Sequence, residues 1–176
     1  MNRHRRISHA TSYFLLLTSY LLLPTLVMPS RVAAQSQDKA LERARKLLRS
    51  TPLIDGHNDL PWAIRERKDA PMDVARYDLR KPTEGHTDLA RLAEGQVGAQ
   101  FWSIYIPGEI KDSGFAKVQL EQFDIARRTV ARYPDRLELA LTADDIQRSF
   151  KRHHVGSLLG MEGGHAIENS LGALRS

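Results

Sequence analysis

Apolar positions along the chain recur with two alternating spacings, one typical of helices and the other typical of strands. The helical spacing predicts helices over residues 37–50, 62–67, 88–94, 114–133, 142–153 and 169–175. Short apolar or β-branched runs between them predict strands over residues 53–55, 97–106, 137–141 and 155–161. Residues 68–86 follow neither spacing, so we expect a loop there.

Strands that alternate with helices at these distances predict a parallel sheet with right-handed crossover connections. Four such units fit two α/β architectures, a doubly wound sheet and the first half of an eight-stranded barrel. Two helix starts are also predicted: Thr87 as the N-cap of the helix that Gly95 ends, and Thr142 with Asp145 as a capping box. Because the last helix stops with the chain at Ser176, we expect a truncated domain.

Composition excludes several classes of protein. With 176 residues, 41% of them hydrophobic and 27% charged, the chain is not a disordered tail, a collagen or a coiled-coil rod. It contains no cysteine, which excludes disulfides, a thiolate nucleophile and cysteine-ligated zinc in this segment. His, Asp and Glu are therefore the remaining zinc ligands.

The net charge of +5 comes almost wholly from the N-terminal segment. The first 34 residues contain four arginines and no acidic residue, whereas the rest of the chain contains 22 basic and 21 acidic side chains. An apolar stretch, Phe14–Met28, and the small residues Val32–Ala34 follow the first three arginines. This layout predicts a signal peptide over residues 1–34, because 15 interrupted apolar residues are short for a membrane anchor.

We therefore expect an exported domain over residues 35–176, periplasmic or secreted, with no membrane attachment indicated in this segment. The charge no longer argues for a nucleic-acid partner. Phe101, Trp102 and Tyr105 are accompanied by no basic stripe, so we expect them to pack in the sheet.

Three ionisable side chains follow the ends of two predicted strands. His57 and Asp59 come after the first strand, and residues i and i+2 of an extended segment project to the same side. Glu162 follows the strand over residues 155–161 and precedes Gly163–Gly164, where the backbone can turn sharply. Because ligands collect at the carboxyl ends of parallel strands, these residues predict a metal site suited to zinc.

A purely structural interpretation of the same residues stays open at this point. Asp59 also suits the N-cap of the following helix, with His57 an ordinary loop residue. Glu162 also suits a solvated strand end. The pattern His-x-Asp arises often by chance, so it does not decide between these interpretations.

Three blocks in order carry a family resemblance: LIDGHNDLPW at 53–62, VGAQFWSIY at 97–105, and GMEGGH at 160–165 with SLGALR at 170–175. They resemble the membrane (renal-type) dipeptidase family of zinc peptidases, peptidase family M19. The resemblance implies a (β/α)8 TIM-type barrel of the metal-dependent hydrolase type, of which this chain holds the N-terminal half. It implies two zinc ions, with His57 and Asp59 binding one and Glu162 bridging both.

The implied activity is hydrolysis of dipeptides by metal-activated water, in an enzyme that usually forms a homodimer. The family's second-zinc histidines and substrate-binding residues come after the last block, so the catalytic residues stay unassigned here. His165, the only histidine after Glu162, is expected at most to line the site. We expect the isolated 176-residue chain to be inactive.

Two alternatives remain. One is another metal-dependent amidohydrolase on the same barrel, although such enzymes usually open with His-x-His where this chain has His57-x-Asp59. The other is a non-catalytic exported binding protein that kept the fold. Two histidines in downstream sequence favour the enzyme, and their absence favours the binding protein.

Overall fold

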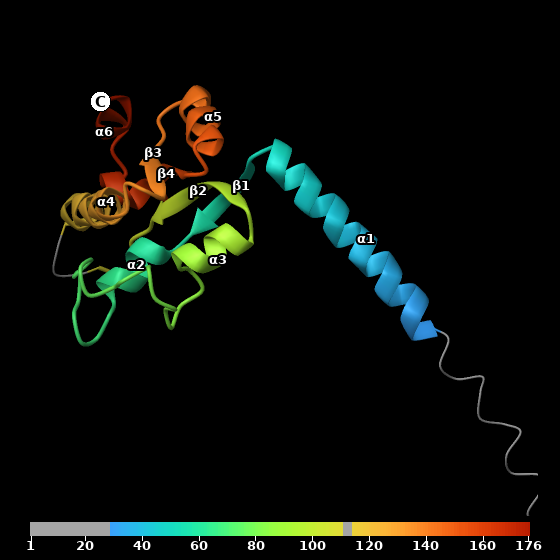
Figure 1. Ribbon diagram of the computed structural model, residues 1–176. Coiled ribbons are helices and arrows are strands. Elements are labelled where there is room, and N and C mark those ends of the chain that lie inside the picture. Colours follow the sequence, from blue (N-terminus) through green and yellow to red (C-terminus); the bar gives the residue numbers. More distant parts are fainter. Residues whose placement is uncertain (1–28, 111–113) are drawn as a thin grey trace, which may run out of the picture. The chain divides into compact units, whose positions relative to one another are not determined.

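The computed structural model describes residues 29–110 and 114–176, drawn as ribbons in Figure 1. The chain divides into two units, Met1–Arg43 and Ala44–Ser176. Helix α1 (Pro29–Ser50) begins in the first unit and ends in the second.

Helix α1 begins earlier than its apolar stripe predicts, at Pro29 instead of residue 37. The predicted signal peptide over residues 1–34 falls mostly outside the described residues, and its cleavage stays a prediction. Among the helices in the described part of the chain, none combines the length and apolar character of a bilayer-spanning segment.

Four strands of the second unit form one parallel sheet in the order β1-β2-β4-β3. They are β1 (Leu53–Asn58), β2 (Val97–Ile104), β3 (Leu137–Leu139) and β4 (Val155–Met161). The parallel direction confirms the α/β prediction. In a barrel, consecutive strands are neighbours, whereas here β4 pairs directly with β2 and the short β3 pairs with the outer edge of β4. The sheet therefore keeps β1, β2 and β4 side by side in chain order, with β3 as a short edge strand.

Helices lie on both faces of this sheet. The helices that follow α1 are α2 (Leu60–Arg65), α3 (Leu89–Glu94), α4 (Phe115–Arg132), α5 (Ala143–Lys151), the 3-10 helix η1 (Gly164–Ile167) and α6 (Leu171–Arg175). Helices α2, α3 and α4 pack with Trp102 of β2 in the main core. Ala99 lies three residues before Trp102 and so faces the other side, where it packs with Ile146 of α5.

The inward face of α4 includes two buried glutamines. Gln119 Nε2 donates to the Ile104 carbonyl at 3.0 Å, and Gln122 Oε1 accepts from Arg65 Nε at 2.6 Å. These partners offset part of the cost of burying the two amides, whose other polar atoms, Gln119 Oε1 and Gln122 Nε2, have no partner among the described residues.

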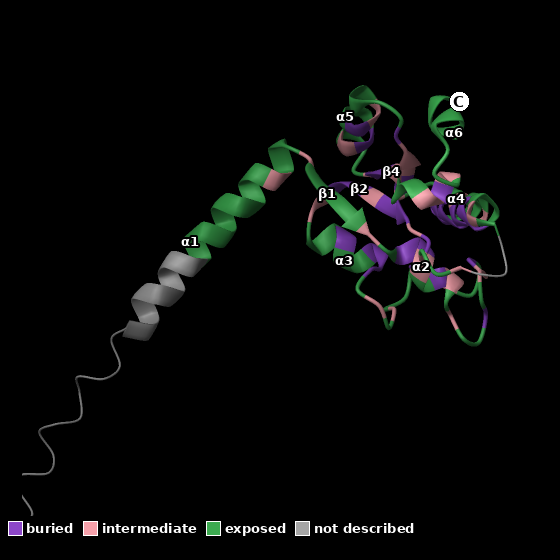
Figure 2. Cartoon of the chain, turned by 180° about the vertical axis from the view of Figure 1, so that it is seen from behind, coloured by how far each residue is buried: buried purple, intermediate pink, exposed green. Residues whose placement is uncertain are grey.

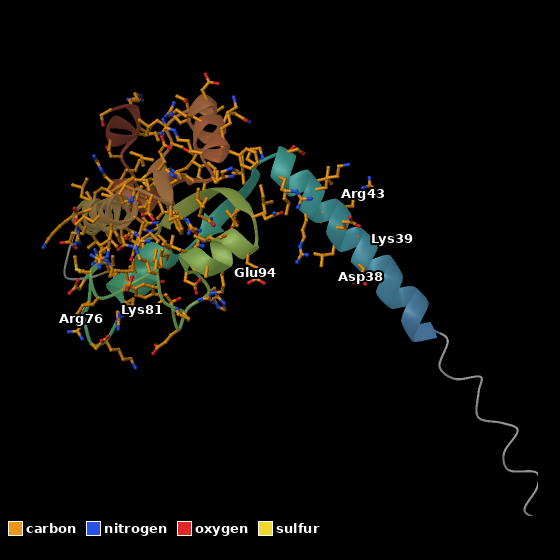
Figure 3. The ribbon with its side chains drawn as sticks, viewed as in Figure 1. Asp38, Lys39, Arg43, Arg76, Lys81 and Glu94 are labelled. Carbon is orange, nitrogen blue, oxygen red and sulfur yellow. The ribbon has the colours of Figure 1, made fainter. Side chains whose placement is uncertain are left out.

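The predicted loop between α2 and α3 is held by residues that follow α4. Leu79 N donates to the Tyr133 hydroxyl at 2.8 Å, and Arg80 pairs with Asp135 at 2.8 Å. By contrast Lys81, which Figure 3 labels on the same loop, has a side chain that is 79% exposed. Side-chain hydrogen bonds therefore order a segment that lacks helical or strand periodicity.

One predicted helix cap is wrong and the other is confirmed. Asp88, not Thr87, is the N-cap of α3, and its Oδ1 accepts from Arg91 N at 2.8 Å. At α5, Thr142 Oγ1 accepts from Asp145 N at 3.2 Å and Asp145 Oδ2 accepts from Thr142 N at 2.9 Å. Aspartate thus completes the capping box in place of the commoner glutamate.

Candidate metal centre

Strand β1 carries two of the three predicted ligands at its carboxyl end. The strand continues to Asn58, so His57 lies within it and not in the loop expected after the apolar run. The extra length follows from the backbone, which pairs with β2 as far as Asn58 opposite Trp102. Asp59 comes next, two residues after His57, and the two side chains share one side of the extended segment.

The third predicted ligand comes from β4. Glu162 follows Met161, the last residue of that strand. His57 Nε2 lies 3.0 Å from Asp59 Oδ1, and His57 Nδ1 lies 4.0 Å from Glu162 Oε2. One potential ligand atom from each of the three residues lies within 4.8 Å of the others. The fold thus brings together side chains more than 100 positions apart in the sequence.

The position of Asp59 bears on its alternative role as a helix cap. Asp59 occupies the N-cap position of α2, yet its carboxylate makes no capping hydrogen bond to the described residues. The Leu60 amide instead donates to Asn58 Oδ1 at 3.0 Å. The Asp59 carboxylate faces His57, where it is available to an ion.

Glu162 is held from the neighbouring strand β2. Ser103 Oγ donates to Glu162 Oε2 at 3.1 Å. Directly after Glu162, Gly163 has a φ of +86°, which residues with a Cβ rarely adopt, so the predicted glycine turn is confirmed at this position. Sequence reasoning missed Ser103, whose signal is a hydroxyl within an otherwise apolar or amide-bearing strand.

Asn58 supports the site from the opposite side of β1. Its Nδ2 donates to Thr87 Oγ1 at 2.9 Å and lies 3.4 Å from Gln100 Oε1. Thr87 precedes the buried Asp88, whose pKa lies below its usual range chiefly because the Arg91 backbone N–H donates to the carboxylate. Through its hydrogen bond with Asn58, Thr87 holds the strand end that carries the ligands. The sequence alone did not indicate this role.

His165, the possible lining residue, makes contacts elsewhere. Its Nε2 lies 2.9 Å from the Ile106 carbonyl oxygen, and its ring meets Phe115 edge-on, with 5.4 Å between the ring centres. Within residues 29–110 and 114–176, the only side chains grouped as a metal would require are His57, Asp59 and Glu162. His165 thus ties η1 to the segments around α4.

The three grouped side chains are open to solvent, at 55%, 58% and 50% exposure for His57, Asp59 and Glu162. A cavity of about 490 Å³ lies beside the first two and is also lined by His86 and Arg91. A larger cavity of about 780 Å³ lies at the amino ends of β2 and β4, and its described lining residues include none of the three. One imidazole and two carboxylates suit a divalent metal such as zinc, and their exposure leaves coordination positions open.

The sequence matches the family model described as membrane dipeptidase (peptidase family M19) over residues 41–176. Dipeptidase 3 from Mus musculus and Dipeptidase 3 from Rattus norvegicus are each 44% identical to the chain over 142 residues. These matches cover 80% of this chain, but only 27% of the mouse protein and 28% of the rat protein. The chain thus spans little more than a quarter of the length of these curated relatives.

Two solved structures share the fold. A metallo peptidase from Rhodobacter sphaeroides, liganded with a phosphinate mimic of the dipeptide L-Ala-D-Ala, matches with a TM-score of 0.60 and 22% identity, over 70% of this chain and 41% of that one. The probable dipeptidase PvdM from Pseudomonas aeruginosa matches with a TM-score of 0.61 and 17% identity, over 78% and 34%. The described sheet and helices correspond to part of the (β/α)8 barrel of such dipeptidases.

Proposed function

The chain belongs to the membrane dipeptidase family, and from that premise we propose that it supplies one side of the zinc site of an exported dipeptidase. The resemblance of three sequence blocks predicted the family, and the match over residues 41–176 confirms it. The proposed reaction is metal-assisted hydrolysis of a dipeptide.

One observation carries the proposal: His57, Asp59 and Glu162 approach one another within 4.8 Å at the carboxyl ends of β1 and β4. Zinc in catalytic sites takes three protein ligands of this N and O type and keeps a further position open. When bound, such an ion polarises a carbonyl and lowers the pKa of water. We propose zinc as the metal and two ions per complete site, with Glu162 shared between them.

The chain's own residues would hold and orient the ion. The imidazole of His57 offers a ring nitrogen, and two carboxylates offer the negative charge that a divalent cation requires. Asn58, bonded to Thr87 on the buried side, fixes the strand end from which His57 and Asp59 project. Because these contacts are made within the protein, the ligands are positioned before an ion arrives.

The substrate class is proposed from the named relatives. The mouse and rat proteins carry the name dipeptidase, and the Rhodobacter protein holds a mimic of L-Ala-D-Ala. We propose a dipeptide substrate and a homodimeric complete enzyme. For the 176 residues alone we expect zinc binding without turnover, because ligands that are half exposed do not exclude bulk water from a reacting peptide.

Zinc binding by the purified 176-residue chain tests the metal site. A competition titration against a chromophoric chelator is expected to show binding that His57→Ala weakens by at least about tenfold. His86→Ala is the matched control, because His86 lines the same cavity and lies outside the group of three. Absence of binding by the unmodified chain contradicts the proposal and favours the non-catalytic binding protein.

Hydrolysis of L-Ala-D-Ala by the zinc-loaded chain, followed by detection of released D-Ala, tests the expectation of no turnover. Zinc-dependent release that disappears in His57→Ala contradicts that expectation. It would at the same time support the dipeptidase activity directly.

Export is proposed from the arginines, apolar stretch and small residues of the N-terminal segment. We expect the mature protein in a secreting host to begin at Gln35. N-terminal sequencing of the exported protein measures this, and an N-terminus that retains Phe14–Met28 contradicts it.

A further inference from the structure

We propose that Ser103 is a positioning residue that orients Glu162 and thereby sets the affinity of the site for its metal ion. This inference rests on the proposed metal site. Ser103 lies in β2 and is 4% exposed, whereas the Glu162 side chain is 50% exposed. Its hydroxyl donates to Glu162 Oε2 at 3.1 Å. Within the described residues, this is the only hydrogen bond that the Glu162 carboxylate receives.

The strand register explains why a serine at this position reaches the glutamate. Ser103 pairs with Gly160 of β4, and Glu162 lies two residues further along the same chain segment. Residues two apart on an extended segment share a face, so Glu162 projects on the side where Gly160 leaves room. The Ser103 hydroxyl therefore meets the carboxylate across a position that has no side chain.

The hydrogen bond acts on the part of the site that is otherwise least restrained. Glu162 follows the end of its strand and precedes the turn at Gly163, and its long side chain has rotamer freedom to lose when it binds an ion. The serine restricts that freedom beforehand. It occupies one acceptor position of Oε2, so Oε1 and a second position on Oε2 stay available to a metal.

The buried environment of Ser103 fixes the position from which its hydroxyl donates to Glu162. The neighbouring β2 residues Trp102 and Ile104 are 1% and 0% exposed, so the strand that presents the hydroxyl is fixed in the core. Partners that hold a metal ligand commonly change metal affinity 10–100-fold when they are removed. We expect loss of the hydroxyl to fall at the lower end of this range, because the site has two further ligands.

The test compares Ser103→Val with Ser103→Thr in the 176-residue chain, because valine and threonine have nearly the same volume and differ in the hydroxyl. Zn²⁺ affinity is measured by chelator competition, and the visible spectrum of the Co²⁺-loaded chain reports ligand geometry. We expect Ser103→Val to raise the Kd about tenfold and to alter the Co²⁺ spectrum. Ser103→Thr is expected to stay within about threefold of the unmodified chain and to keep its spectrum.

A control is Ser157→Ala on β4, because Ser157 is a second buried serine whose hydroxyl donates to the Val155 carbonyl at 3.4 Å, away from the site. We expect it to leave the Kd unchanged.

Equal affinities for the Val and Thr variants overturn the role of Ser103 while the metal site stands. Equal losses in both, with lowered unfolding midpoints, assign Ser103 to packing and also overturn it. An unmodified chain that binds no Zn²⁺ overturns the metal site and this inference with it.

Discussion

Strands β1 and β2 are adjacent and parallel, yet one is exposed along its length and the other is buried. Figure 2 shows β1 mostly in the exposed colour and β2 mostly as buried or intermediate. On β1, Leu53 and Ile54 are 41% and 46% exposed, whereas Trp102 and Ile104 on β2 are 1% and 0% exposed. Among the described residues β1 pairs only with β2, while β2 pairs on both sides.

The difference separates the residues that could bind an ion from the residues that hold them in place. His57, which offers a ligand atom, belongs to the exposed strand, where an ion and solvent can reach it. The groups that hold the site in place come from covered positions: Gln100 and Ser103 on β2, and Thr87 before α3. A rigid strand therefore supports an accessible one, an arrangement typical of functional sites on a scaffold.

Removing the largest buried side chain of β2 is expected to have the largest effect. Trp102→Ala should lower the free energy of unfolding by about 3–5 kcal/mol, because it leaves a cavity in the core formed with α2, α3 and α4. Urea unfolding followed by far-UV circular dichroism measures this loss. The matched change on β1, Ile54→Ala, should cost about 1 kcal/mol or less, because that side chain is already half in water. Equal losses at the two positions would show that β1 is covered in solution.

Hydrophobic spacing predicted the covered part of the molecule better than the exposed part. The strand over residues 155–161 was predicted with its observed bounds, because its residues form one continuous apolar run that starts at buried positions. Strand β1 was predicted to end at Asp55, since its last residues are polar and only the pairing with β2 extends it to Asn58. Strand order was also out of reach, because nothing in a three-residue strand such as β3 specifies its neighbour.

The candidate metal site was likewise predicted only in part. His57, Asp59 and Glu162 could be proposed as ligands because their residue types and their places after strands are visible in the sequence. The residues that hold them could not, because a hydroxyl such as that of Ser103 acquires its role only when β2 and β4 are in register. Thr87 was likewise interpreted from its local sequence as a cap, whereas its partner, Asn58, lies 29 residues away.

An intermediate effect is expected at Asn58, which joins strand β1 to the buried Thr87. Asn58→Ala removes the donor to Thr87 and the acceptor for the Leu60 amide, and should lower the free energy of unfolding by about 1–3 kcal/mol. It should also weaken Zn²⁺ binding, because His57 and Asp59 lose their support. Both quantities can be measured on one preparation, by urea unfolding and by chelator competition.

Thr87→Val provides the control for the contact between Asn58 and Thr87. It keeps the side-chain volume and removes the hydroxyl to which Asn58 donates a hydrogen bond. If the two residues act through one hydrogen bond, the double variant loses less stability than the sum of the two single variants. Strict additivity would mean that Asn58 and Thr87 contribute separately and that the anchor is not a unit.

The smallest effect is expected from the charge of Asp88, the residue that follows Thr87. The pKa of Asp88 is lowered in the folded chain, chiefly by the hydrogen bond from the Arg91 backbone N–H. A lowered folded-state pKa means that the ionised carboxylate stabilises the fold above its unfolded pKa of about 3.9, and that this stability is lost as the pH falls through the folded value. The Arg91 side chain adds little to this contribution, because it is 42% exposed and screened by solvent. Asp88→Asn keeps a side-chain acceptor for the N-cap but not the charge, so its unfolding free energy should fall less between pH 6 and pH 3 than that of the unmodified chain. Parallel pH profiles for the two proteins would show that the charge of Asp88 adds no pH-dependent stability.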